Sequence, residues 1–135
     1  MEYFAEYKEA TSILIVDDET ATLEVMGKLI EREGFITTCV SSGAEALWKL
    51  EKQQFACMIT DFHMLAMNGL ELATHAQTID PHMPIVLCTG DVSPFLRKDA
   101  AAAGIKAVFR KPVDFQDILK MLQEETGSLG QNRLD

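Results

Sequence analysis

Five polar residues of the sequence, each following a short apolar run, together carry the chemistry of phosphoryl transfer. They are Asp17, Asp18, Asp61, Thr89 and Lys111. Carboxylates held close together repel one another unless they take up protons or share a cation, and an open all-oxygen site suits Mg²⁺. A hydroxyl and an ammonium group both bind phosphoryl oxygens. The set therefore supplies the parts needed to move a phosphoryl group onto an aspartate, a reaction that depends mostly on positioning and charge neutralisation.

Strands must bring these residues together, because they are far apart along the chain. Apolar runs of strand length precede them at 12–16, 55–60, 85–88 and 106–109, and a further strand is predicted at 35–40. The carboxyl ends of parallel strands meet at one edge of a sheet, where open α/β folds place their ligands. We therefore expect the polar residues to converge around Asp61.

Helical patterns separate the predicted strands. Thr20 is expected to cap the first helix, Ser42 and Glu45 have the spacing of a capping box, and Ser93 precedes Pro94 as in a helix N-terminus. Strict alternation of strands and helices predicts a doubly wound α/β fold, with a five-stranded parallel sheet covered by helices on both faces. The almost continuously apolar strands agree with a sheet that is buried on both sides.

The chain is predicted to form one domain with short extensions. Residues 1–10 form an acidic N-terminal extension, in which Tyr3, Phe4 and Tyr7 can share one side of a short helix. The domain itself is expected to span 11–124. The small and polar residues of 125–135 are typical of a tail or of the start of a linker.

Composition excludes several classes of function. The 135 residues carry a net charge of −9, which argues against nucleic-acid binding by this chain. No apolar run is long enough to span a membrane, and the N-terminus does not resemble a signal peptide, so a cytoplasmic location is expected. Cys39, Cys57 and Cys88 lie in or beside apolar runs and lack zinc-ligand spacing, which predicts buried free thiols.

The pattern as a whole resembles the receiver domain of two-component response regulators, which is CheY-like. The matching segments are residues 13–19, the loop 61–69, Thr89-Gly90 and Lys111-Pro112, in the order and spacing of that family. The resemblance covers residues 11–124. It implies a flavodoxin-like sheet with strand order 2-1-3-4-5.

The resemblance also implies a role for each polar residue. Asp61 would accept a phosphoryl group from a histidine kinase or a phosphotransfer protein. Asp17 and Asp18 would hold Mg²⁺, helped by Asp61 and by the backbone carbonyl of His63. Thr89 and Lys111 would bind the phosphoryl oxygens, and the Lys111–Pro112 peptide bond would be cis. Such a domain signals rather than turning over a substrate, although it promotes its own phosphorylation and slow autodephosphorylation.

Three residues beside this site are predicted to set the lifetime of the phosphorylated form. His63 and Asp91 would flank the path of the attacking water, and Gly90 lacks a side chain and leaves that path open. An acid at position 91 can orient water, whereas a bulky His63 can obstruct it. The alternative is that His63 and Asp91 are ordinary exposed loop residues.

Two residues depart from the family pattern. Leu65 replaces the usual proline after the loop methionine, which removes no ligand. Val108 replaces the aromatic residue whose rotation reports phosphorylation. We therefore expect a switch without a rotating ring, in which the face formed by the fourth helix, fifth strand and fifth helix changes conformation. Phe95 is a candidate to fill the vacated space, and the same face is a candidate homodimer surface.

Two rival functions remain at this point. A haloacid-dehalogenase-like phosphatase also uses an aspartate nucleophile, but it needs a second acid two residues later, where this chain has His63. An atypical receiver, acting as an interaction module without phosphorylation, would fit Val108 but not the complete acidic set.

Overall fold

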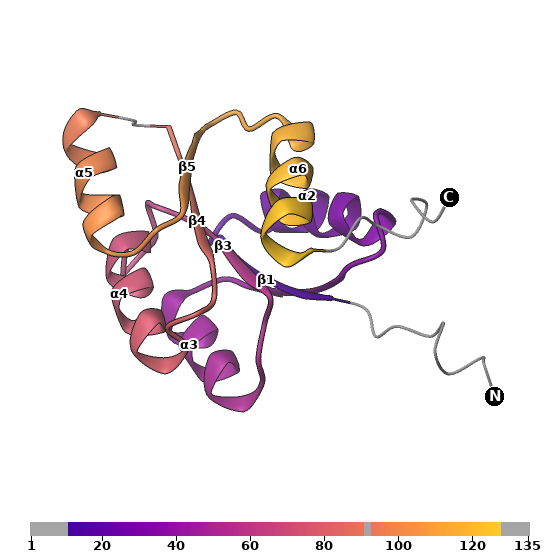
Figure 1. Ribbon diagram of the computed structural model, residues 1–135, viewed down its shortest axis with the longest axis horizontal. Coiled ribbons are helices and arrows are strands. Elements are labelled where there is room, and N and C mark those ends of the chain that lie inside the picture. The colour runs from indigo at the N-terminus through magenta and orange to yellow at the C-terminus, as the bar shows by residue number, and fades with distance from the viewer. Residues whose placement is uncertain (1–10, 91–92, 128–135) are drawn as a thin grey trace.

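A computed structural model describes residues 11–90 and 93–127, in which strands and helices alternate (Figure 1). The strands are β1 (Ser12–Val16), β2 (Ile36–Val40), β3 (Cys57–Asp61), β4 (Ile85–Thr89) and β5 (Ala107–Arg110). The helices are α2 (Thr20–Arg32), α3 (Gly43–Lys52), α4 (Gly69–Ile79), α5 (Pro94–Ala102) and α6 (Phe115–Thr126). The last helix therefore includes Glu125 and Thr126, which were expected in the tail.

All neighbouring strands pair in parallel, in the order β2-β1-β3-β4-β5. This confirms the doubly wound, flavodoxin-like sheet with strand order 2-1-3-4-5. Val16 lies beside Thr60, and Asp61 lies beside Cys88, so the carboxyl ends of the three central strands are level. The residues that follow these strands consequently share one edge of the sheet.

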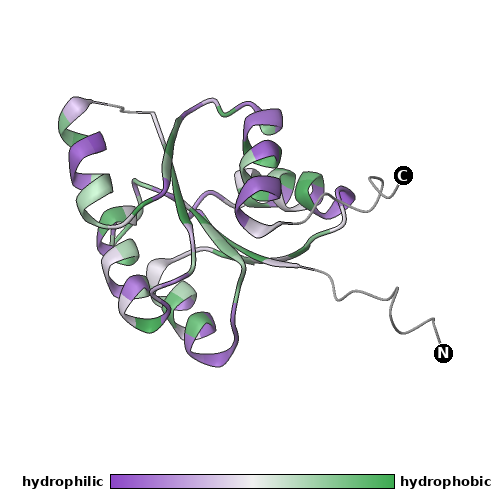
Figure 2. Cartoon of the chain, viewed as in Figure 1, coloured by the Kyte–Doolittle hydropathy of each residue, from purple (hydrophilic) through white to green (hydrophobic). Residues whose placement is uncertain are grey.

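Alternate residues of each central strand enter two separate cores, one on each face of the sheet (Figures 1 and 2). Leu14, Met58 and Leu87 pack beneath α3, α4 and α5, whereas Ile13 and Ile59 pack beneath α2 and α6. The green apolar strands in Figure 2 lie between helices that turn purple faces to solvent. Burial on both faces removes the freedom of β1 and β3 to shift without opening a core.

Side-chain caps define several helix starts. Asn68 caps α4 with a reciprocal capping box to Glu71, and Ser93 caps α5, which has Pro94 in its first turn. The predicted box at the start of α3 forms only in part. Ser42 accepts from the N–H of Glu45, but the Glu45 carboxylate accepts from the N–H of Ser41 instead.

Two local predictions were wrong. Thr20 does not cap α2, because it is already helical, and the carboxylate of the preceding residue, Glu19, accepts from the Thr22 hydroxyl rather than from a backbone N–H of the first turn. Cys39 is exposed because β2 is an edge strand, although Cys57 and Cys88 are buried and all three thiols are free. Phe95, the candidate to fill space beside β5 after phosphorylation, is 80% exposed in this structure.

Some sequence-based predictions lie outside the described residues. They are the short helix with Tyr3, Phe4 and Tyr7, the position of Asp91, and the tail beyond Gly127. Among the helices that are described, none has the length and apolarity needed to cross a bilayer.

Candidate functional site

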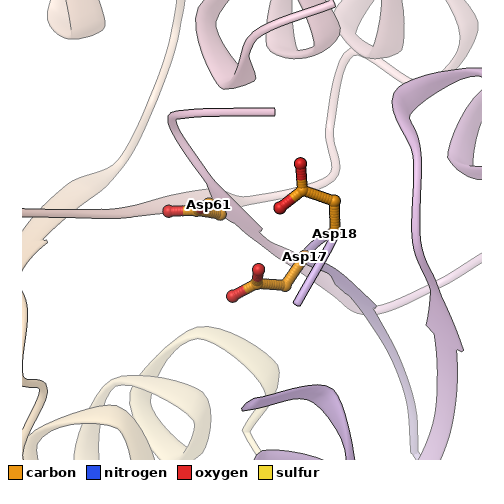
Figure 3. A group of neighbouring side chains, drawn as sticks. All are labelled: Asp17, Asp18 and Asp61. Atoms are coloured by element: carbon orange, nitrogen blue, oxygen red, sulfur yellow. The ribbon is translucent and has the colours of Figure 1, made fainter. Parts of the chain in front are cut away.

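Three carboxylates meet at the level edge of the sheet (Figure 3). Asp61 is the last residue of β3, and Asp17 and Asp18 directly follow β1, the neighbouring strand. One oxygen from each of the three lies within 4.8 Å of the others. Asp17 and Asp61 are 5% and 9% exposed, whereas Asp18 is open to solvent. The strands thus bring together the three acids that were predicted to share a site.

Lys111 supplies a positive charge to this group. Its ammonium lies 2.9 Å from Oδ1 of Asp61 and 3.5 Å from Oδ2 of Asp17. Burial alone would lower the pKa of Lys111, but the hydrogen bond to Asp61 and the charges of both carboxylates outweigh it and raise the pKa. Three carboxylates and one ammonium leave a formal charge of −3 + 1 = −2, which is the charge that one divalent cation neutralises.

Asp17 is held in its position at an electrostatic cost. Burial raises the pKa of its carboxyl group, and the charge of Asp61 adds to that effect. The backbone N–H of Glu19 donates to Asp17 Oδ1 at 3.0 Å, and together with Lys111 it partly offsets the rise in the pKa. A buried acid of this kind gains when a cation is added, because the cation stabilises its charged form.

The backbone of Asp61 is enclosed by α4. A side-chain carbon at Gly69, the first residue of that helix, would lie only 2.5 Å from the carbonyl oxygen of Asp61. The N–H of Gly69 also donates to the carbonyl of Phe62 at 2.8 Å. Thr60, fully buried, donates its hydroxyl to the same Asp61 carbonyl at 2.9 Å. Asp61 is therefore fixed by close packing as well as by its strand.

The loop that follows Asp61 reaches back to the acidic group. The N–H of Leu65 donates to Oδ2 of Asp18 at 3.4 Å, and the Leu65 side chain is 84% exposed. Ala66 has a φ of 70°, a left-handed conformation that is uncommon for residues with a side chain. His63 is exposed and packs edge-on against Phe62, with ring centroids 4.6 Å apart.

The remaining predicted residues lie on β4, on β5 and just beyond them. Thr89 ends β4 and is fully buried, and its carbonyl accepts from the N–H of Lys111 at 2.8 Å. A side-chain carbon at Gly90 would meet no atom within 4 Å, so the approach there is open. Val108 is half-buried against the core that lies beneath α5. The Lys111–Pro112 peptide bond is cis.

Sequence reasoning missed a cavity of about 630 Å³ that opens beside the carboxylates. Its walls are mostly apolar and come from β1, β3, β4, α2 and the segment after β5, including Met26, Cys88 and Val113. Burial raises the pKa of Cys88 to about 12, so its thiol stays protonated at neutral pH. No local motif marks this cavity, because it depends on how α2 packs against the segment after β5.

Comparison with known families and proteins agrees with this geometry. Residues 13–123 match the model of the response regulator receiver domain. The response regulator receiver protein CpdR of Brucella abortus (strain 2308) is 30% identical over 112 residues, covering 83% of this chain and 93% of CpdR. The transcriptional regulatory protein GlrR of Escherichia coli (strain K12) is 34% identical over 105 residues, covering 76% of this chain but only 23% of GlrR.

Solved structures show the same architecture. A CheY-like receiver domain protein from Methanospirillum hungatei JF-1 superposes with a TM-score of 0.84 at 31% identity, covering 88% of this chain and 95% of that one. The chemotaxis protein CheY4 of Vibrio cholerae superposes with a TM-score of 0.82 at 26% identity, covering 86% and 98%. With the fold, the acidic group and most of the chain's length matched, this chain belongs to the family of response regulator receiver domains.

Proposed function

We propose that Asp61 accepts a phosphoryl group from a histidine kinase or a phosphotransfer protein. The observation that carries this proposal is the placement of one nearly buried carboxylate, 2.9 Å from the Lys111 ammonium and beside two further acids. A carboxylate oxygen can act as the nucleophile toward phosphorus, and the adjacent ammonium can bind a phosphoryl oxygen. Membership of the receiver family supports the same role.

Mg²⁺ fits the acidic group. The possible ligands are all carboxylate oxygens, which hard cations prefer. One of these carboxylates belongs to the exposed Asp18, so the site is open to the waters that Mg²⁺ usually keeps. Asp17, Asp18 and Asp61 would hold the ion, together with the backbone carbonyl of His63. The bound ion would neutralise charge on the phosphoryl oxygens.

The protein's own residues then have defined parts in the transfer. A carboxylate oxygen of Asp61 forms a bond to phosphorus as the bond between phosphorus and the histidine nitrogen breaks. The nitrogen keeps the electron pair, takes up a proton and leaves as neutral imidazole. Lys111 and Thr89 bind phosphoryl oxygens, and the open space at Gly90 admits the donor.

The signal would leave through the face formed by α5, β5 and α6. Helix α5 buries only Leu96 and Ala100 among its own residues, and no residue of β5 is fully buried: three are partly buried and Arg110 is exposed. Basic and acidic residues both lie on this face, as in the ion pair of Lys106 with Glu125 at 3.8 Å, which favours a protein partner or a second copy there. Five of the chain's 12 basic residues are among them: Arg97, Lys98, Lys106, Arg110 and Lys120.

A phosphorylation-independent interaction module is the second candidate. Val108 is the observation that favours it, because a short β-branched side chain cannot make the ring rotation that would couple Thr89 to β5. In that case the chain would bind its partner equally well with and without a phosphoryl group.

Acetyl phosphate with Mg²⁺ tests the acceptor directly. Intact mass should rise by one phosphoryl group in the wild type and in the control Asp99→Asn, which changes an exposed acid of α5. Asp61→Asn should stay unlabelled. Labelling of Asp61→Asn to the wild-type level would assign the acceptor elsewhere, and an unlabelled wild type would favour the interaction module.

Calorimetry tests the cation site separately. Asp18→Ala should weaken Mg²⁺ binding by about tenfold or more, the usual cost of losing a hard-cation ligand or its support. The control Glu24→Ala removes an exposed acid from the side of α2 and should bind Mg²⁺ as the wild type does. An unchanged affinity of Asp18→Ala for Mg²⁺ would show that Asp17 and Asp18 do not form the proposed site as a pair.

A further inference from the structure

The two edge strands of the sheet are protected very differently. Within the described residues, β5 pairs only with β4 and β2 pairs only with β1. Charged residues flank and end β5, namely Lys106, Arg110 and Lys111, and Pro112 follows them. Charge and proline are the usual means by which proteins prevent an edge strand from pairing with another chain. Strand β2, with the sequence Ile-Thr-Thr-Cys-Val, has neither.

The free edge of β2 presents a defined set of backbone groups. The N–H of Ile36 donates to Thr11, and the carbonyl of Val40 accepts from Asp17, so these two residues face β1. Alternation along a parallel ladder turns Thr38 the same way and turns the N–H and C=O groups of Thr37 and Cys39 outward. The outward groups are spaced as one further strand requires.

The edge is also accessible. Ile36 is 50% exposed and Cys39 is exposed, although both lie within a strand. A shallow groove of about 310 Å³ runs beside Thr37 and Cys39, between α2 and β2. Helix α2 approaches the strand at Gly27, where a side-chain carbon would lie 3.0 Å from the sulfur of Cys39.

We propose that β2 pairs antiparallel with β2 of a second copy of this chain, which joins the two sheets into one. A two-fold axis at Thr38 places Thr37 opposite Cys39 of the second copy, and these pairs exchange the outward hydrogen bonds. Thr38 then lies opposite its own counterpart, a pairing of two threonines that is favourable across strands. In this register all five residues of β2 lie opposite a residue of the second β2. A register centred on Thr37 or Cys39 would leave residues at one end of each strand without a counterpart.

Self-complementarity makes a second copy the proposed occupant. Two chains with a net charge of −9 repel over most of their surfaces, so a self-contact has to use a strand without charge, and the nearest acid, Glu31, accepts from the Thr37 hydroxyl at 2.8 Å. The five residues of β2 carry no charge and are self-complementary under the two-fold axis. The proposed contact lies at the opposite edge of the sheet from β5, and it is therefore distinct from the α5, β5 and α6 face.

Sedimentation equilibrium with the full chain tests the pairing. Wild type and Thr38→Ser should show the same rise in average mass with concentration. Thr38→Lys and Thr38→Glu each place like charges opposite one another across the axis and should need at least about tenfold higher concentration to dimerise. Mixing the two charged variants should restore the dimer, because lysine then faces glutamate. Far-UV circular dichroism will show that each variant is folded.

Disulfide trapping tests the register. In a Cys39→Ser background, Thr38→Cys places two thiols directly opposite each other on a non-hydrogen-bonded pair, where Cα atoms lie about 4.5 Å apart, within the range for a disulfide. Mild oxidation should give a covalent dimer. Arg110→Cys in the same background, on the other edge strand, is the matched control and should give little. A wild type that stays monomeric at about 1 mM, or dimers unaffected by both charged variants, would overturn the proposal.

Discussion

The site has two halves that differ in how firmly they are packed. The carboxylate half, formed by β1 and β3 with Asp17 and Asp61, lies on strands whose apolar residues are almost wholly buried. The outer half, formed by β4, α5 and β5, carries Thr89 but ends in a strand with no fully buried residue and a helix with two buried residues. The carboxylates, whose proposed reaction depends on exact positioning, lie in the firmly packed half. The elements expected to move, α5 and β5, lie in the half where displacement breaks few buried contacts.

Adding one methyl group to each half is the strongest test of this difference in packing. Gly69→Ala forces a carbon toward the Asp61 carbonyl and should lower the free energy of unfolding by about 1–3 kcal/mol, as overpacked cores do. It should also slow phosphorylation by acetyl phosphate, because the acceptor must shift. Gly90→Ala meets open space and should change stability by less than about 0.5 kcal/mol. Equal losses of stability in urea denaturation would show that the two halves are packed alike.

Removal of a charge from the firm half should stabilise it. The pKa of Asp17 is raised in the folded state from its ordinary 3.8, so ionisation of this group opposes folding above the folded-state pKa. Without Mg²⁺, Asp17→Asn should be more stable than the wild type by about 1 kcal/mol at pH 7. The advantage should shrink as the pH falls through the folded-state pKa and vanish below 3.8, where both states are protonated.

Urea denaturation at several pH values measures this difference, and added Mg²⁺ should diminish it at pH 7 because the ion stabilises the ionised wild type. An Asp17→Asn variant that is less stable than the wild type at neutral pH would show that the hydrogen bond and ion pair of Asp17 outweigh its burial.

Beryllofluoride, which mimics the phosphoryl group, should sharpen the comparison without altering the chain. Amide chemical shifts should change most at the site and then along residues 93–110, because Thr89 moves toward the ligand and α5 is lightly held. Phe95, exposed in the structure, is a suitable reporter if it turns inward. Changes concentrated instead on α2 or α3 would place the responsive half on the other side of the sheet.

The smallest expected effects concern the lifetime of the acyl phosphate. His63→Ala and Asp91→Ala should each alter the dephosphorylation rate several-fold, or about 1 kcal/mol in the barrier, with opposite signs if one residue shields the phosphoryl group and the other orients water. His82→Ala, in an exposed turn after α4, is the control for the loss of a histidine. Identical rates in all variants would assign His63 and Asp91 no part in hydrolysis.

The sequence was sufficient to predict features that local patterns determine. Parallel apolar strands imply that Asp17 and Asp61 converge, and Ser93-Pro94 signals the start of α5 without reference to the rest of the fold. The N-terminus of α2 could not be read in this way, because the helix begins at Thr20 itself and the preceding Glu19 makes no cap to a backbone N–H. Neither could the exposure of Cys39, which depends on which strand lies at the edge.

The charge balance of the site was only partly accessible from sequence. Asp61 and Lys111 are 50 positions apart, and their contact depends on the turn after β5 bringing the ammonium back over β3. The cavity beside them was not predictable, since its walls come from five segments whose spacing is set by packing. The sequence was thus sufficient to propose which residues form the site, but not to predict the cavity beside them.

The Leu65 amide and a bound cation would draw on the same carboxylate, that of Asp18. Where a cation pulls Asp18 away from the loop, the hydrogen bond from Leu65 lengthens, and a loop that holds Ala66 in a left-handed conformation is less firmly tied. By reciprocity, a protein that binds the exposed Leu65 and holds the loop down would then lower the affinity for the ion by the same factor. Loop capture and metal loading would in that case oppose each other, and a docked partner would be sensed at the metal site without touching it.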